Sequence, residues 1–112
     1  MNDNAFNITV SSNEKDAPKM LDGNDYTCWS PSLRAPHYIR INSMNYFGEI
    51  VLINQAGYNC RTIAVRDKTY LFDEDAMVQV INLDEHVNGV EIKIVDTWDP
   101  YGRVCIYNMF LK

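Results

Sequence analysis

The sequence lacks the features that mark a membrane span or a nucleic-acid surface. No apolar run in its 112 residues approaches the roughly 18 residues that a membrane-spanning helix needs. Lysine and arginine number 10 against 15 acidic residues, and they form no basic stripe that could neutralise phosphates. The net charge of -5 points the same way. We therefore expect neither a membrane span nor a nucleic-acid partner.

Catalytic and zinc-binding residues are also scarce. His37 and His86 have no histidine, cysteine or glutamate at a spacing typical of a metal site. Cys28 could act as a nucleophile with one of these histidines as its base, but a buried cysteine beside a core tryptophan such as Trp29 is the more frequent arrangement. No Cys-x-x-Cys pair and no phosphate-cradling glycine loop is present. We therefore expect a protein without catalytic activity and without zinc.

The cysteines are few and odd in number: Cys28, Cys60 and Cys105. The N-terminal residues contain no basic segment followed by an apolar run, which a secretory signal peptide would need. An odd cysteine count without such a signal is typical of reduced thiols. The sequence therefore predicts a protein of the cytoplasm, the nucleus or both.

The alternation of apolar and polar residues predicts an all-β protein. At 46% hydrophobic residues, the chain can bury the core of one domain, residues 1–112. Seven or eight short strands are expected within the ranges 7–11, 37–42, 47–54, 62–72, 76–83, 90–95 and 103–111. The range 62–72 fits one long strand or a hairpin, and an Asn-Gly pair predicts a turn over 84–89. Strands at this spacing, almost without helix, favour an antiparallel sandwich or barrel.

A loop rich in aromatic residues precedes the last expected strand. An Asp-Pro pair and Gly102 predict a tight turn that carries Trp98 and Tyr101. These aromatics either plug the open end of the sandwich or face a partner. Arg103 either pairs with an acid or presents its guanidinium to a ligand. The candidate partner-binding residues are Trp98, Asp99, Tyr101 and Arg103, with Arg34 and Tyr58 as weaker candidates.

The segment LDGNDYTCW, residues 21–29, contains a second loop of interest. Asp22, the glycine and Asn24 favour a turn in which side chains bond to their own backbone. The Asp22 carboxylate, loop carbonyls and the Thr27 hydroxyl would also converge as oxygen donors, which suits calcium. A closed turn and a calcium loop are therefore both open, and Trp29 anchors the loop onto the core in either case.

Four segments in this order resemble the discoidin domains, also called coagulation factor 5/8 type C domains. LDGNDYTCW is similar to the tryptophan-loop motif of that family, and the segments at 10–12, 36–41 and 88–94 are similar to its strands. The residues from 96 to 111 resemble the C-terminal end of small intracellular members. The resemblance implies a galactose-binding-like jelly roll, an antiparallel β-sandwich.

The resemblance also implies a binding function without catalysis. Small intracellular members act as adaptors or as subunits of larger protein complexes, so a protein partner is expected, and a calcium-stabilised carbohydrate-binding lectin domain is the alternative. Relatives that bind calcium use the tryptophan loop and a glutamate of the last strand. The residues carried over are Asp22, Asn24 by its carbonyl and Thr27, with Asn108 at the glutamate position, where the lost charge implies weaker binding. Extracellular members usually join their chain ends with a disulfide, but here no cysteine lies near the N-terminus.

Overall fold

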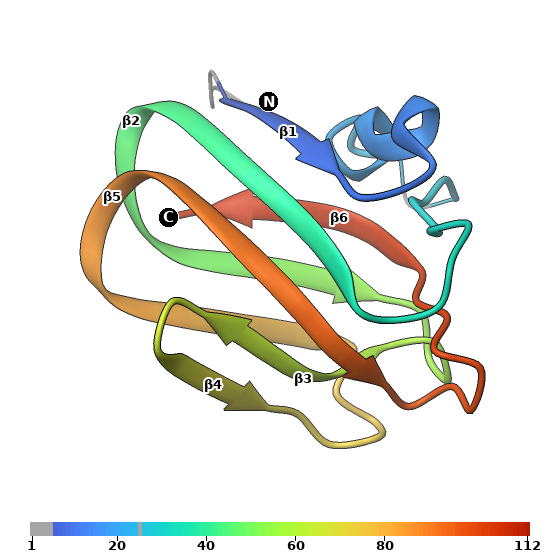
Figure 1. The fold of residues 1–112 in the computed structure, drawn as a ribbon. Helices are drawn as coiled ribbons and strands as arrows, with labels where there is room; N and C mark the ends of the chain where they lie inside the picture. Colours follow the sequence, from blue (N-terminus) through green and yellow to red (C-terminus); the bar gives the residue numbers. More distant parts are fainter. Residues whose placement is uncertain (1–5, 25) are drawn as a thin grey trace.

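The computed structural model describes residues 6–24 and 26–112 and consists mostly of antiparallel β-structure (Figure 1). Its elements in chain order are strand β1 (Phe6–Val10), the 3₁₀ helix η1 (Glu14–Met20) and strands β2 (His37–Asn54), β3 (Cys60–Val65), β4 (Lys68–Leu71), β5 (Val78–Thr97) and β6 (Ile106–Leu111). In this described part of the chain, none of the helical structure has the length and apolar character required to traverse a bilayer.

The long strands β2 and β5 bend and contribute to both layers of a sandwich. Residues 37–42 of β2 pair with 89–94 of β5, within a sheet ordered β1–β2–β5–β3–β4. Beyond the bend, residues 49–53 of β2 pair with 78–82 of β5, and β6 pairs with this same part of β2. Figure 1 shows both strands folding back on themselves. One layer therefore has five strand segments and the other has three, which together form a jelly roll.

The eight expected segments are thus present as six strands, because two pairs of them are continuous. Residues 84–89, predicted as a turn from an Asn-Gly pair, lie inside β5. Gly89 pairs with Asn42 of β2, so this backbone belongs to the ladder. The change of direction falls at register shifts and at Asp84, whose φ of 59° is left-handed. The turn prediction is wrong because cross-strand pairing outweighs the local preference.

The hairpin alternative for residues 62–72 is confirmed. β3 and β4 pair from Val65 opposite Lys68 to Thr62 opposite Leu71. Arg66 in the connecting turn has a φ of 57°. β4 is the edge of the five-stranded layer.

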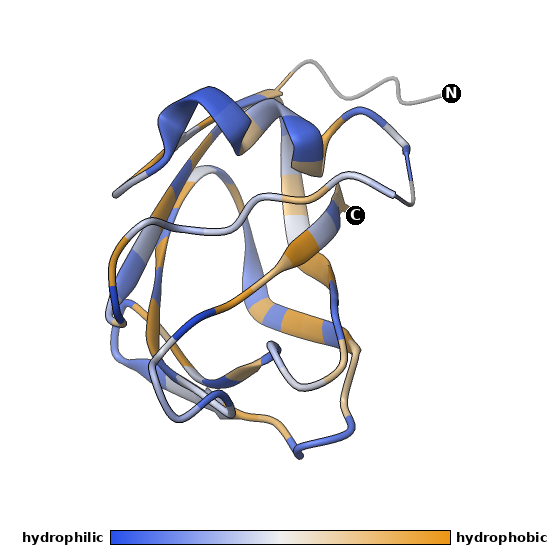
Figure 2. Ribbon diagram, turned by 90° about the vertical axis from the view of Figure 1, so that its right-hand side faces the viewer, coloured by the Kyte–Doolittle hydropathy of each residue, from blue (hydrophilic) through white to orange (hydrophobic). Residues whose placement is uncertain are grey.

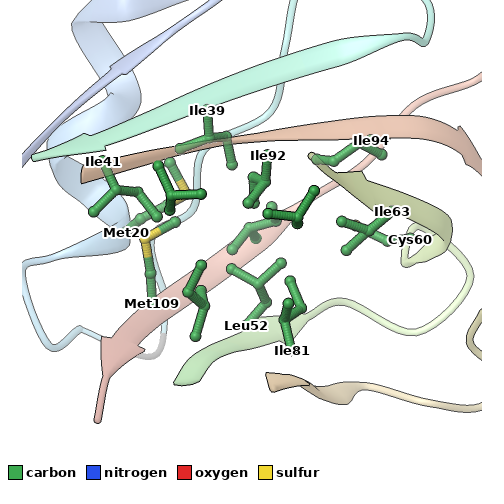
Figure 3. Close-up of a cluster of buried hydrophobic side chains, with 14 of the residues drawn as sticks. Met20, Ile39, Ile41, Leu52, Cys60, Ile63, Ile81, Ile92, Ile94 and Met109 are labelled. Atoms are coloured by element: carbon green, nitrogen blue, oxygen red, sulfur yellow. The ribbon is translucent and has the colours of Figure 1, made fainter. Parts of the chain in front are cut away.

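Apolar side chains from both layers meet in one core. Ile39 and Ile92 project from the five-stranded layer, and Leu52 and Ile81 face them from the other layer (Figure 3). Alternation along each strand places apolar residues inside and polar residues outside, as the changing colours along the strands of Figure 2 show. Trp29 is fully buried, and its indole nitrogen donates to the carbonyl of Ser12. The prediction that Trp29 anchors its loop on the core is therefore confirmed.

The cysteines differ from the expectation of reduced thiols. Cys28 and Cys105 form a disulfide across 77 residues of sequence, with their Cα atoms 6.0 Å apart. They come together because Trp29 pairs with Ile106 in a two-residue β-bridge, which brings the neighbouring cysteines side by side. Cys60 is a buried thiol, and desolvation raises the pKa of its sulfhydryl. Sequence separation gave no hint of this pairing.

Candidate ligand-binding site

Three loops converge at one end of the sandwich, on the right of Figure 1. The backbone amide of Cys105 donates to the carbonyl of Tyr58 at 2.9 Å, and that of Ala35 donates to Gly102 at 3.2 Å. These bonds join the loop between β2 and β3 and the segment before β2 to the loop between β5 and β6. Residues widely separated in sequence thus form one surface.

Arg103 is held in place by Asp99, four residues earlier in the same loop. Its Nε donates to Oδ2 at 2.9 Å and its Nη2 donates to Oδ1 at 3.0 Å, so the two groups pair through two parallel bonds. The backbone amides of Tyr101 and Arg103 also donate to Oδ2. The Arg103 guanidinium and these amides lower the pKa of Asp99 to about 2. The carboxylate therefore stays charged at any physiological pH.

The guanidinium of Arg103 also lies between two tyrosine rings. Its central carbon is 5.3 Å from the ring centre of Tyr58 and 5.3 Å from that of Tyr101. The side chain of Arg103 is 53% exposed, whereas that of Asp99 is 5% exposed. Asp99 is therefore buried beneath the surface and holds Arg103 in position. Arg103 and the two tyrosines form the exposed part, which a ligand can contact. We call Tyr58, Tyr101 and Arg103 the tyrosine–arginine site.

Gly102 and His37 fix the shape of this loop. Gly102 has a φ of 75°, and a Cβ added there would lie 2.8 Å from the backbone nitrogen of Ala35, so only glycine fits. His37 is fully buried, and its Nε2 donates to the Gly102 carbonyl at 2.8 Å. Burial lowers the pKa of His37 and favours its neutral form. Both residues act on the site by holding its backbone.

The structure separates Trp98 from the other predicted partner-binding residues. The indole nitrogen of Trp98 donates to the carbonyl of Phe72, and its ring lies 4.6 Å from the guanidinium carbon of Arg61. Trp98 therefore belongs to a different surface, at the edge formed by β3 and β4. Sequence reasoning missed Arg61, because only the pairing of Cys60 with Thr97 brings β3 alongside the end of β5.

Two predictions remain: Arg34 as a partner-binding residue and Arg103 as the start of the last strand. The Cα of Arg34 would lie 3.6 Å from a Cβ at Gly102, and the residue is exposed beside the tyrosine–arginine site. Arg103 does not open the last strand, because β6 begins at Ile106. The expectation that residue 103 starts a strand is wrong, since the bonds to Asp99 keep it in the loop.

The loop of Asp22, Asn24 and Thr27 is closed by its own hydrogen bonds. Asp22 accepts from the backbone amide of Asn24 at 2.9 Å and from the Thr27 hydroxyl at 2.7 Å. These two donors lower the pKa of Asp22. The fifth residue of the LDGNDYTCW motif, Asp25, lies outside the described residues. The closed turn predicted from the sequence is thus present.

The oxygen donors of this loop suit calcium, with one described carboxylate among them. Thr27 lies two residues before Trp29, and Asn108 lies two residues after Ile106, which is the bridge partner of Trp29. The bridge therefore brings the predicted loop ligands toward the strand that carries Asn108. Asn108 is buried and pairs with Ile53 of β2. Within residues 6–24 and 26–112, no three histidine, cysteine or acidic side chains gather as a metal site.

The arrangement offers no nucleophile of the kind considered from the sequence. Cys28 is in the disulfide, and His37 is occupied with the Gly102 carbonyl. His86 lies at the bend of β5, with its ring against Gly48. The three residues are therefore not assembled as a catalytic group.

Solved structures share this fold at low sequence identity. The family 32 carbohydrate-binding module of NanJ from C. perfringens, in complex with galactose, has a TM-score of 0.76 at 15% identity, over 96% of this chain and 93% of that one. Chitosan-binding module 1 of a chitosanase/glucanase from Paenibacillus sp. IK-5 has a TM-score of 0.71 at 18% identity, over 96% and 95%. The F5/8 type C domain of a Bacteroides fragilis protein has a TM-score of 0.70 at 15% identity, over 96% and 90%.

No protein-family model and no curated protein matches the chain. The structural matches nevertheless cover nearly all of it. The chain therefore has the galactose-binding-like jelly-roll fold of the discoidin, or F5/8 type C, domains. The fold class predicted from the sequence motifs is confirmed.

Proposed function

We propose that this protein is a non-catalytic binding module that recognises a carbohydrate at the tyrosine–arginine site. The observation that carries the proposal is the position of Arg103. Its guanidinium is fixed by the buried Asp99 and flanked by two tyrosine rings, at an exposed loop surface. Apolar faces beside a few fixed polar groups are the general composition of small-ligand sites.

The chemistry of the site matches that of a sugar. A pyranose ring has a C–H face, which packs on an aromatic ring, and hydroxyl groups, which accept hydrogen bonds from a guanidinium. Asp99 occupies Nε and Nη2 of Arg103, so that Nη1 has no hydrogen-bond partner among the described residues. Holding the donor rigid reduces the entropy lost on binding. Two solved proteins with this fold are a module in complex with galactose and a chitosan-binding module, and this supports the proposal.

The test is to titrate the protein with galactose and with a panel of neutral sugars. Binding is measured by calorimetry or by changes in NMR chemical shift. Tyr101→Ala should weaken binding at least tenfold, because it removes an exposed ring of the site. Tyr46→Ala is the matched control, since Tyr46 is similarly exposed, at 68%, but lies at the bend of β2. Arg103→Lys should also weaken binding, because lysine keeps the charge and loses the planar fork. Equal affinity of Tyr101→Ala and the wild type would contradict the proposal.

A protein partner is the second candidate, in the adaptor role that the sequence resemblance implies. The observation in its favour is an apolar strip on the outer face of the three-stranded layer. Val51 pairs with Val80 on one side and with Phe110 on the other, and Val80 and Phe110 are 46% and 43% exposed. Such strips often mark protein contacts. Capture of a partner that is lost with Val80→Asp but kept with Tyr101→Ala would favour this role over sugar binding.

Calcium and localisation complete the proposal. We propose a structural calcium site at Asp22, Asn24 and Thr27, with Asn108 as a neutral donor, and a site with so little charge should bind weakly.

Localisation in the cytoplasm or nucleus stays a prediction, and the Cys28–Cys105 disulfide argues against it, because such bonds persist in oxidising compartments. Thiol alkylation in denaturant, on protein from its own cell and before and after reduction, tests it: two cysteines that react only after reduction would contradict a reducing compartment.

A further inference from the structure

The Cys28–Cys105 disulfide joins two loops next to the tyrosine–arginine site. Cys28 ends the loop before Trp29, and Cys105 ends the loop between β5 and β6 that carries Arg103. The bridge between Trp29 and Ile106 lies directly beside the bond, and its two backbone hydrogen bonds are 2.9 and 3.0 Å long. The disulfide is therefore a covalent link at the base of the loop that presents Arg103.

Cys105 also holds the loop of Tyr58 through its backbone. The amide of Cys105 donates to the Tyr58 carbonyl at 2.9 Å, and the carbonyl of Cys105 accepts from the Gln55 amide at 2.9 Å. The ring centre of Tyr58 lies 5.3 Å from the guanidinium carbon of Arg103, two residues before Cys105. The position of Cys105 thus sets how Tyr58 and Arg103 face each other, and the disulfide fixes that position.

The two bonded cysteines differ from the third cysteine in exposure. Cys28 and Cys105 are each partly exposed, whereas Cys60 is fully buried. A disulfide is reduced when a thiolate reaches one of its sulfur atoms, so exposed disulfides are the more labile ones. Burial raises the pKa of the Cys60 thiol, which keeps this residue out of thiol exchange. The Cys28–Cys105 bond can therefore open and close without competition from Cys60.

Noncovalent contacts hold both segments in the sandwich when the sulfur atoms separate. Trp29 and Ile106 are fully buried and remain joined by their backbone bridge. The indole nitrogen of Trp29 also donates to the Ser12 carbonyl at 3.0 Å. Reduction should therefore loosen the loops on either side of this bridge, while the core stays folded.

We propose that the Cys28–Cys105 bond is a redox switch for the tyrosine–arginine site, in which the disulfide form binds the ligand more tightly than the dithiol form. The inference rests on the proposed carbohydrate function and adds its regulation. The reason is entropic, since a ligand of the dithiol form must order loops that the disulfide already holds.

The reductant that the switch requires is a dithiol. One thiolate of the dithiol attacks a sulfur of the Cys28–Cys105 bond and forms a mixed disulfide, which its second thiol then resolves. The products are two cysteine thiols and the oxidised, cyclic form of the dithiol. Two electrons and two protons thus pass to the protein. The reverse reaction restores the bond.

The first experiment titrates galactose into the oxidised protein and into protein reduced with dithiothreitol. Reduction should weaken binding about tenfold, within the usual range of coupling between two sites. The double variant Cys28→Ser/Cys105→Ser should bind as the reduced wild type does and should not respond to the reductant. Cys60→Ala keeps the bonded pair, so this control should retain the full response. Equal affinity of the oxidised and reduced wild type would overturn the switch.

The reduction potential gives a readout that a merely stabilising disulfide would not change. If the disulfide form binds galactose about ten times more tightly, saturating galactose must favour the disulfide by the same factor. The midpoint potential of this two-electron couple should then become about 30 mV more negative. Mixtures of reduced and oxidised dithiothreitol, quenched by alkylation, measure the potential with and without galactose. A potential that ignores galactose, in protein that binds it, would show that the bond and the site are independent.

Amide hydrogen exchange tests the switch without any ligand. Reduction should speed the exchange of the Gln55 and Cys105 amides at least about tenfold, because their loops open locally. The amide of Gly48, which donates to the Lys112 carbonyl at 2.8 Å near the bend of β2, is the control and should change less. Equal acceleration at all three amides would overturn the switch, since the disulfide would then only stabilise the whole fold.

The outcomes separate the switch from the carbohydrate function. Galactose binding that is equal in both redox forms overturns the switch and leaves the carbohydrate function standing. If neither galactose nor any neutral sugar of the panel binds the oxidised protein, the carbohydrate function fails. The amide exchange of Gln55 and Cys105 then decides by itself whether the bond controls these loops.

Discussion

Two arginines at the same end of the sandwich stack on aromatic rings, but their surroundings differ. Arg103 lies 5.3 Å from two tyrosine ring centres, and it is paired through two bonds with the buried Asp99. Arg61 lies 4.6 Å from the ring centre of Trp98 and has no ion pair among the described residues. The first arginine is neutralised and fixed by a direct ion pair, whereas the second makes no direct ion pair in the described part of the chain, although Asp73 and Asp96 line an open groove together with it.

The comparison shows that stacking alone does not define the role of an arginine. A carboxylate partner removes the net charge of Arg103 and leaves directional donors, which suits a neutral hydroxylated ligand. At Arg61 the neighbouring acids set the sign of the field, because they outnumber it. The two surfaces should therefore respond differently to changes of charge, pH and covalent bracing.

The largest expected effect is on stability, and it comes from removing the disulfide that ties down the chain beside Arg103. Cys28→Ser with Cys105→Ser should lower the free energy of unfolding by about 4 kcal/mol, from the entropy of closing a loop of this length. Thermal and denaturant unfolding measure the change. A reductant should destabilise the wild type and leave the double variant unaffected, since Cys60 is buried and unpaired. Equal stability of wild type and variant would mean that noncovalent contacts alone brace this loop.

The next largest effect is the difference in stability between variants of Asp99 and of Asp96. Asp99→Asn should cost about 2 kcal/mol of stability, because it weakens a charged pair and two backbone contacts. Asp96→Asn should change stability by less than about 0.5 kcal/mol, since its buried oxygen has no donor to lose. Chemical denaturation of both variants gives the difference directly. A larger loss for Asp96→Asn would reverse the comparison.

The pH dependence should follow Asp99. Its pKa is about 2 in the folded protein and near 3.8 without its partners. A lowered folded pKa means that the stabilisation is complete above about pH 4 and is lost as the pH falls toward 2. The difference in melting temperature between wild type and Asp99→Asn should therefore shrink over that range. A difference that stays constant from pH 5 to 2 would show that Asp99 does not titrate there.

The smallest expected effect is that of calcium on stability, through the loop of Asp22, Asn24 and Thr27 that precedes Cys28. A site with a dissociation constant near 1 mM would add about 1 kcal/mol of stability at 5 mM calcium. Melting curves of chelator-treated protein with and without calcium measure this shift, and Asp22→Asn should abolish it. No shift in the wild type would mean that the internal hydrogen bonds of the loop replace the ion.

Much of the fold is predictable from local sequence. The alternating pattern placed β1 and the β3–β4 hairpin correctly, and the tryptophan motif identified the jelly roll. The sequence wrongly predicted a turn over 84–89, because Asn88 and Gly89 favour a turn locally, while the pairing of Gly89 with Asn42 of β2 keeps this segment in a strand. Of the residues expected at the last loop, Tyr101 and Arg103 lie together, whereas the direction of Trp98 depends on its contacts with Phe72 and Arg61.

By itself, the sequence determined the all-β class, the buried faces of the strands and the tight turn at Gly102, since these depend on residues within a few positions of one another. Only the tertiary structure decided that Cys28 meets Cys105, that Tyr58 joins Arg103, and that Trp98 turns to Arg61. The two aromatic contacts join residues that are 37 or more positions apart in the sequence. The disulfide joins residues that are 77 positions apart. Such contacts follow from the register between strands, which is set by packing of the whole core and carries no local signal.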